Sequence, residues 1–103
     1  MMFLACAVVK MVIAQSCSLK DRRRVMQGLT ATIGKANHLA AADLSPDGTL
    51  NLGILGLTAV SNTLHHATEL RETALRSLDR DGRFEVISIV TEEIKLESGE
   101  AGL

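Results

Sequence analysis

The sequence predicts an α+β domain of the ferredoxin-like type, with elements in the order β-α-β-β-α-β. Apolar runs typical of buried strands occupy 2–13 and 84–96, near the two ends of the chain. Two segments with apolar residues at helical spacing, about 18–33 and 62–78, stand between them. A turn signature at 45–48 divides the middle of the chain into two further strands. Right-handed crossovers then place both helices on one face of a four-stranded antiparallel sheet.

The size and composition are those of one globular domain. The chain has 103 residues, of which 47% are hydrophobic and 22% charged, and its formal net charge is −1. This length suffices for one core without disulfides or metals. A net charge near zero gives no general attraction to DNA or to a membrane surface. We expect a single domain over 1–97, a flexible acidic tail over 98–103 and no cofactor.

The first apolar run, 2–13, predicts a central strand, because it contains no turn residue and is apolar at both parities. It is too short to span a bilayer. It also lacks a preceding basic region, and Lys10 interrupts it, so it does not resemble a signal peptide. We therefore expect a cytoplasmic protein without a membrane partner.

A cationic cluster opens the first predicted helix. Ser18 is a candidate N-cap, and Asp21 follows it as a shortened capping box. Cations crowd the first turns, although a helix N-terminus favours acids there. They could hold phosphate together with the free backbone N–H groups of the first turn. The alternative is a solvated face that pairs with glutamates of the last strand, which contributes little to stability. The candidate anion-binding residues are Lys20, Arg22, Arg23 and Arg24.

Gly34 is the expected end of this helix. The segment 36–44 is ambiguous between helix and strand, because it is rich in alanine but short. The turn at 45–48 (Ser-Pro-Asp-Gly) predicts a β-hairpin, whose second strand at 50–60 carries Gly53 and Gly56. Glycines within a strand indicate a bulge or a close packing contact. Ser61 or Asn62 is the expected N-cap of the second helix.

Two helices on one face leave the other face of the sheet without cover, although the first and last strands are apolar at both parities. A bare apolar face of that size is unusual in a soluble monomer. We therefore expect a homodimer that packs sheet to sheet about a two-fold axis. The expected dimer face consists of Leu4, Val8, Val12, Ile87 and Ile89.

No motif in the chain predicts catalysis or a metal. His65 and His66 are neighbours on a helix and point about 100° apart, so they cannot chelate one ion together. The His66–Glu69 spacing occurs in di-metal bundles, but it needs further carboxylates on a facing helix. Cys6 reads as a small buried hydrophobe, and Cys17 has no base beside it. We expect neither an enzyme nor a metal protein.

A family resemblance covers nearly the whole chain, from 3 to about 96. The run 18–23 (Ser-Leu-Lys-Asp-Arg-Arg) resembles the Ser-Leu-Lys-Glu-Lys-Arg signature of the YlxP-like bacterial proteins, a family of unknown function. The Val-Ser-Asn at 60–62 is similar to a second element of that family, whereas the loop 44–49 lacks the Trp of many members. The resemblance implies a ferredoxin-like domain from the bacterial cytoplasm. It also implies a setting in translation or ribosome maturation, because the genes often neighbour those of initiation and ribosome-binding factors.

The leading functional expectation is a non-enzymatic accessory protein that contacts RNA phosphates or a ribosomal partner through the first helix. RNA readers of this fold stack bases on aromatic side chains, and here the only aromatics are Phe3 and Phe84. Any RNA contact would therefore ignore base sequence, and no DNA specificity is expected. The alternative is a protein-interaction or assembly module that uses the apolar sheet face. A third hypothesis is a regulatory domain that binds a small molecule in the dimer cleft.

Overall fold

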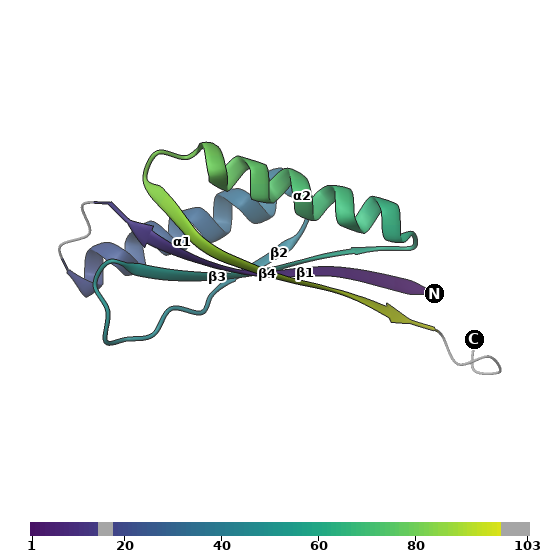
Figure 1. The fold of residues 1–103 in the computed structure, drawn as a ribbon, viewed down its shortest axis with the longest axis horizontal. Coiled ribbons are helices and arrows are strands. Elements are labelled where there is room, and N and C mark those ends of the chain that lie inside the picture. The colour runs from purple at the N-terminus through teal and green to yellow at the C-terminus, as the bar shows by residue number, and fades with distance from the viewer. Residues whose placement is uncertain (15–17, 98–103) are drawn as a thin grey trace.

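The computed structural model describes residues 1–14 and 18–97, so the expected tail over 98–103 and Cys17 lie outside the described part. The strands form one antiparallel sheet in the order β2-β3-β1-β4, and both helices pack on the same face (Figure 1). The predicted ferredoxin-like α+β fold is thus confirmed. The elements are β1 (Met2–Ile13), α1 (Leu19–Asn37), β2 (Ala40–Asp43), β3 (Leu52–Ser61), α2 (Leu64–Arg80) and β4 (Phe84–Leu96).

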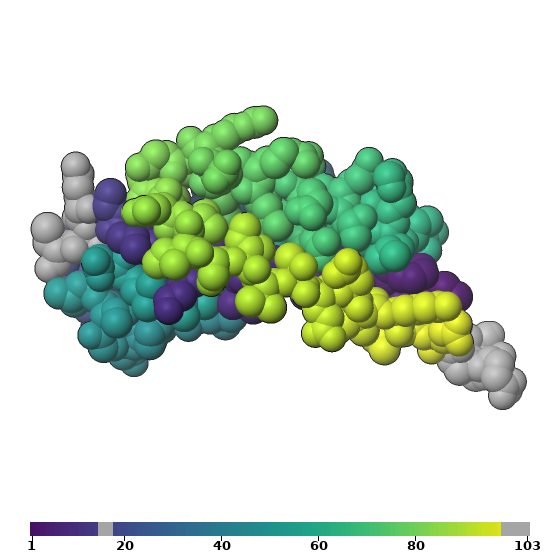
Figure 2. Space-filling model, viewed as in Figure 1, coloured from purple at the N-terminus to yellow at the C-terminus, as the bar shows by residue number. Residues whose placement is uncertain are grey.

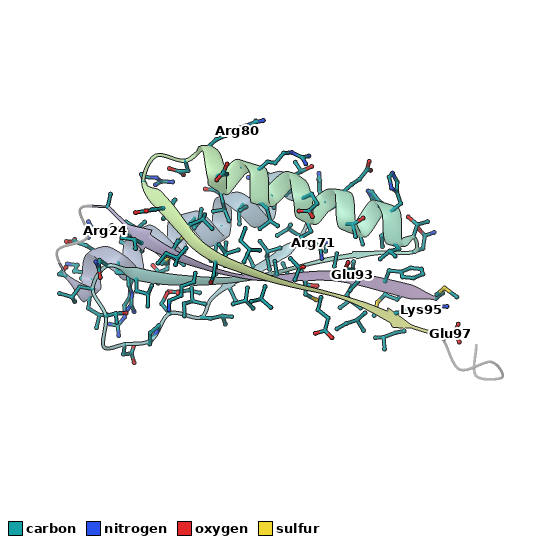
Figure 3. The ribbon with its side chains drawn as sticks, viewed as in Figure 1. Arg24, Arg71, Arg80, Glu93, Lys95 and Glu97 are labelled. Carbon is teal, nitrogen blue, oxygen red and sulfur yellow. The ribbon has the colours of Figure 1, made fainter. Side chains whose placement is uncertain are left out.

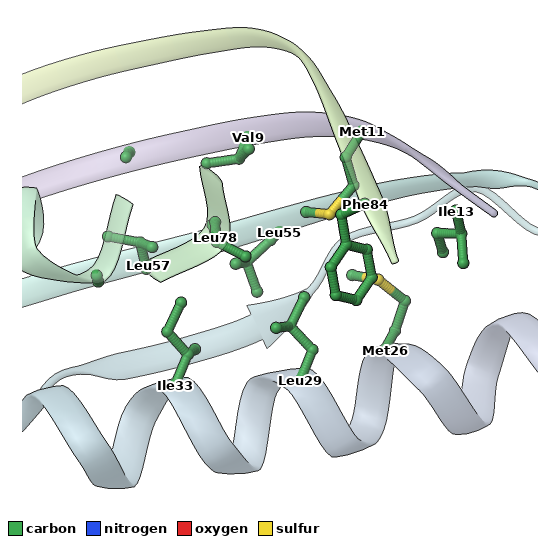
Figure 4. Packing of buried hydrophobic residues seen from close by; sticks show 12 residues of the cluster. Val9, Met11, Ile13, Met26, Leu29, Ile33, Leu55, Leu57, Leu78 and Phe84 are labelled. Carbon is green, nitrogen blue, oxygen red and sulfur yellow. The ribbon is translucent and has the colours of Figure 1, made fainter. Parts of the chain in front are cut away.

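The core lies between the helices and one parity of β1. Val9, Met11 and Ile13 are at most 2% exposed, because alternate residues of a strand point to the same face. Met26 of α1 and Leu78 of α2 pack on them (Figure 4). The remaining members of the buried cluster are Ala7, Leu29, Ile33, Leu55, Leu57, Ala74 and Phe84.

Helix α1 begins as predicted and ends later than predicted. The Ser18 hydroxyl accepts a hydrogen bond from the Asp21 amide at 3.0 Å. At the other end the helix continues past Gly34 to Asn37, and His38 takes the left-handed conformation at φ 54°. Gly34 is needed for another reason: a Cβ there would lie 3.1 Å from the Leu39 carbonyl oxygen, where the chain folds back over the helix end.

The segment 36–44, which the sequence left ambiguous between helix and strand, is helical at its start and a strand at its end. Residues 36 and 37 end α1, while Ala40–Asp43 forms the edge strand β2, paired with β3. The hairpin loop is tied to both strands by Ser45, whose hydroxyl bonds Asp43 and accepts from the Ile54 amide at 2.9 Å. Helix α2 is capped by Thr63 rather than by Ser61 or Asn62.

Arg22 connects α1 to the hairpin loop and does not face solvent. The residue is 1% exposed, and its Nη1 donates to the carbonyl oxygens of Pro46 and Thr49. Buried carbonyls need donors, and an arginine supplies several in fixed geometry. The expectation that Arg22 belongs to an exposed anion-binding cluster is therefore corrected: its guanidinium is committed to the loop.

Replacing Arg22 should unfold the protein more easily than replacing its exposed neighbour. The Arg22→Ala variant removes the guanidinium donor from the two loop carbonyls, at an expected cost of about 2–3 kcal/mol in the free energy of unfolding. Arg24→Ala is the matched control and should change it by less than about 0.5 kcal/mol. Urea denaturation followed by circular dichroism measures both. Equal losses in the two variants would contradict the role given to Arg22.

Candidate functional site

The strongest candidate site is the face of the sheet that carries no helix. Directly opposite residues in antiparallel strands point to the same face. Val9 is buried under the helices, so Val8 and the other even-numbered residues of β1 point away from them. We define the open face as these even-numbered residues, the residues opposite them in β3 and β4, and Ala40 and Ala42 of β2.

Apolar side chains dominate the open face, and several are strongly exposed. Val8, Val60 and Val90 are 43%, 52% and 66% exposed. Ile94 and Leu96 extend the apolar surface along β4, whose yellow-green to yellow atoms run below α2 toward the lower right of Figure 2. Large exposed apolar surfaces on soluble proteins mark sites of contact. The open face is thus a candidate binding surface.

Three of the five predicted dimer-face residues, Leu4, Val8 and Val12, lie on the open face. Ile89 does not join them there, and Ile87 lies at an irregularity of the strand pairing. A β-bulge in β4 leaves Ile87 without an opposite residue in β1, and beyond it Ile89 lies opposite Val9, on the helix-covered face. A bulge adds one residue and so reverses which side chains point to the core.

A shallow hollow of about 290 Å³ lies on the open face over β2, β3 and β1. It exists because the side chains there are small, among them Ala40, Gly56 and Cys6. Leu44 stands beside it: a Cβ on Gly56 would lie 2.7 Å from the Leu44 Cδ1, so the leucine covers the glycine. The face therefore has a raised part and a recessed part.

The second candidate is the cationic end formed by α1. Lys20, Arg23 and Arg24 are exposed, and Arg23 pairs with Asp47 of the hairpin loop at 3.3 Å. Two glutamates that were expected as partners of this cluster pair with other residues. Glu93 pairs with Arg71 and Glu97 with Lys95, away from the end where Arg24 lies (Figure 3).

Arg24 shares a surface pocket of about 360 Å³ with Arg83, which sequence reasoning did not place there. Arg83 is held by Asp81, whose carboxylate accepts from its Nη2 at 2.8 Å and from its Nε at 3.1 Å. Asp21 also lines the pocket, so one carboxylate offsets part of the positive charge. The described residues of this pocket present two guanidinium groups from distant parts of the chain.

Arg71 is a buried charge that sequence reasoning missed. It is 5% exposed on the buried side of α2, and its Nη1 donates to Glu93 at 3.1 Å and to the Cys6 carbonyl at 3.4 Å. Its Nε has no hydrogen-bond partner among the described residues. Its burial could have been predicted from its helical spacing, because Arg71 lies on the same side of α2 as the small, buried residues Ala67 and Ala74. Arg71 fastens α2 to β4 rather than forming a site.

The histidines form separate local contacts. His65 Nε2 lies 3.1 Å from Glu69, and His66 Nδ1 lies 3.0 Å from the Ser61 hydroxyl. His38 is the C-cap of α1. Among residues 1–14 and 18–97, no three His, Cys, Asp or Glu side chains converge where they could hold a metal ion.

Comparison with protein-family models gives a match over most of the chain. A family model described as "Protein of unknown function (DUF503)" matches residues 4–91, which include both helices, β2, β3 and most of β1 and β4. No curated protein matches the chain. In the part of the chain that the structure describes, neither helix is long and apolar enough to cross a membrane.

The Asp81–Arg83 contact should make stability depend on pH. The hydrogen bond from the Arg83 side chain lowers the pKa of Asp81 below its usual 3.8. A carboxyl whose pKa is lower in the folded state stabilises the fold at pH values above its pKa in the unfolded state. This stabilisation is lost as the pH falls through the folded-state pKa. Asp81→Asn should therefore melt about 1–5 °C below wild type at pH 7, because an exposed pair contributes little.

Thermal melts between pH 7 and pH 2.5 test this dependence, and Asp79→Asn, in the last turn of α2, is the control. The difference between wild type and Asp81→Asn should shrink once the pH is below about 3.8. A difference that stays constant over the whole range would contradict the assignment.

Proposed function

We propose that this chain, which belongs to the DUF503 family of proteins of unknown function, acts by binding rather than by catalysis. The open face is its binding surface. The observation that carries this proposal is the set of exposed apolar side chains on the open face, among them Val8, Val60 and Val90. Keeping such a surface in water costs free energy roughly in proportion to its area. A partner that covers it recovers that free energy.

The partner we propose is a second copy of the chain, packed sheet to sheet about a two-fold axis. A two-fold contact brings the same patch of both copies together, so an apolar face meets an apolar face. Paired sheets pack about 10 Å apart with interleaved side chains, which suits the exposed valines of β1, β3 and β4. The chain would then be an assembly module whose unit is a homodimer.

Two neighbouring residues of β4 give a matched test. Val90→Asp places a charge on the open face, whereas Ile89→Asp places the same charge on the other face of the same strand. Sedimentation velocity over a range of concentrations should show a dimer for wild type and Ile89→Asp, and a monomer for Val90→Asp. A dimer that survives Val90→Asp would refute this interface, as would a wild-type monomer at every concentration.

A second candidate function rests on the cationic end. Lys20, Arg23 and Arg24 remain exposed, and Arg83 faces the same pocket as Arg24. These groups suit the phosphates of RNA, and contacts to phosphate carry no sequence information. This is the function that the resemblance to YlxP-like proteins favours, since it places the chain among accessory proteins of translation or ribosome maturation in the bacterial cytoplasm.

RNA binding across a salt series tests this candidate. Affinity for a short single-stranded RNA should fall as salt rises, because each neutralised phosphate releases counterions. The triple variant Lys20/Arg23/Arg24→Ala should bind at least about 10-fold more weakly, and its salt dependence should be shallower. A control that loses the same charge elsewhere, Lys35/Arg76/Lys95→Ala, should bind like wild type. Equal losses in both triple variants would contradict a specific site.

A further inference from the structure

Three charged residues lie on the apolar open face: Lys10 and Glu92 flank its centre, and Glu85, opposite Val12, lies at one end of β4. Lys10 of β1 and Glu92 of β4 are exposed, and neither makes an ion pair with any described residue. Both point to the open face, because Lys10 lies opposite Ile54 and Glu92 lies opposite Cys6. A partner that covers this face must leave these charges in water or supply the opposite charge, since an unpaired buried charge is costly.

The sheet register fixes where Lys10 and Glu92 stand. Ala42, Gly56, Val8 and Val90 lie opposite one another and form a straight row across all four strands. Lys10 is two residues from Val8 on one side of this row. Glu92 is two residues from Val90 on the other side. Each charge is therefore about 7 Å from the row, in opposite directions along the strands.

A two-fold axis lying along this row exchanges its two sides. It carries Lys10 of one copy to a position over Cys6 of the partner, next to Glu92 in the adjacent strand. With sheets about 10 Å apart and strands about 4.8 Å apart, the two Cα atoms would be about 11 Å from each other, a distance that a lysine and a glutamate can bridge. A two-fold axis parallel to the strands leaves Lys10 at the same end of the sheet, far from Glu92.

The shape of the face favours the same axis. Leu44 and Ile54 lie on the Lys10 side of the row, joined by a hydrogen bond from the Leu44 amide to the Ile54 carbonyl at 2.8 Å. Rotation about the row brings them over Ala40 and Thr58 of the partner, which line the hollow. The raised part of one copy thus meets the recessed part of the other.

We propose that two copies pair about an axis along the row from Ala42 to Val90, with Lys10 of each copy bound to Glu92 of the other. This inference rests on the proposed function of the open face and adds the register of the pairing. The two ion pairs act mainly on specificity, since charges across an interface reject wrong alignments more than they add affinity. They select one of the sheet-to-sheet arrangements that an apolar face alone would permit.

Charge reversal tests the register. Lys10→Glu places like charges together at both symmetric contacts of the dimer, and so does Glu92→Lys. Each variant should weaken dimerisation at least about 10-fold in sedimentation velocity. The double variant Lys10→Glu/Glu92→Lys should recover the wild-type constant to within about 3-fold. Glu69→Lys, the same charge change on the exposed side of α2 and away from the open face, should leave the constant within about 3-fold of wild type.

Mixing the two single variants gives a second readout. A dimer of one Lys10→Glu copy with one Glu92→Lys copy restores both opposite-charge contacts, so the mixture should dimerise about as tightly as wild type. This separates lost pairing from misfolding, because a misfolded variant would not be rescued by its partner.

The outcomes distinguish the two proposals. A wild-type monomer at all concentrations overturns the proposed function and this inference with it. A wild-type dimer with unaffected single variants, or with no recovery in the double variant and the mixture, overturns the register and leaves the open-face dimer standing. Weakening by the single variants with recovery in both the double variant and the mixture supports the register.

Discussion

The structure depends on one constraint: two helices cover only one face of a four-stranded sheet. In β1, Val9, Met11 and Ile13 lie under the helices and form the core, while Val8 points away from them. A strand in which both parities are apolar has only half of its apolar surface covered by this fold. The uncovered half, continued by Val60 and Val90, is the surface from which the proposed function follows.

Two buried arginines account for much of the remaining architecture. Arg22 donates to carbonyls of the hairpin loop, and Arg71 joins α2 to Glu93 and to the backbone of β1. Each has a buried Nε without a hydrogen-bond partner among the described residues, so each bears a desolvation cost that its other contacts must offset. Because Arg22 is bound to the hairpin loop and Glu93 to Arg71, the cationic cluster of α1 has one cation fewer and lacks a glutamate that was expected to neutralise it.

The order of elements and the central pair of strands could be predicted because apolar periodicity and turn residues report them directly. The burial of Arg22 could not, although its spacing from Met26 and Leu29 places it on the apolar stripe of α1, because a charge ordinarily argues for solvent. The face of the sheet on which Ile89 lies was also predicted wrongly. Strict alternation groups Ile89 with Ile87, but the bulge changes the parity, and a bulge depends on pairing that the sequence of one strand does not specify. The surface chemistry was therefore harder to predict than the fold.

The central claim is that a second copy covers the open face. The most direct measurement is an isotope-filtered nuclear Overhauser experiment on a mixture of labelled and unlabelled protein, at a concentration where the chain is dimeric. A dimer through the open face should give intermolecular contacts from the methyl groups of Val8 and Val90, and from Leu44 to Ala40. A dimer with no intermolecular contacts at these methyl groups would contradict this claim, as would contacts confined to the helices.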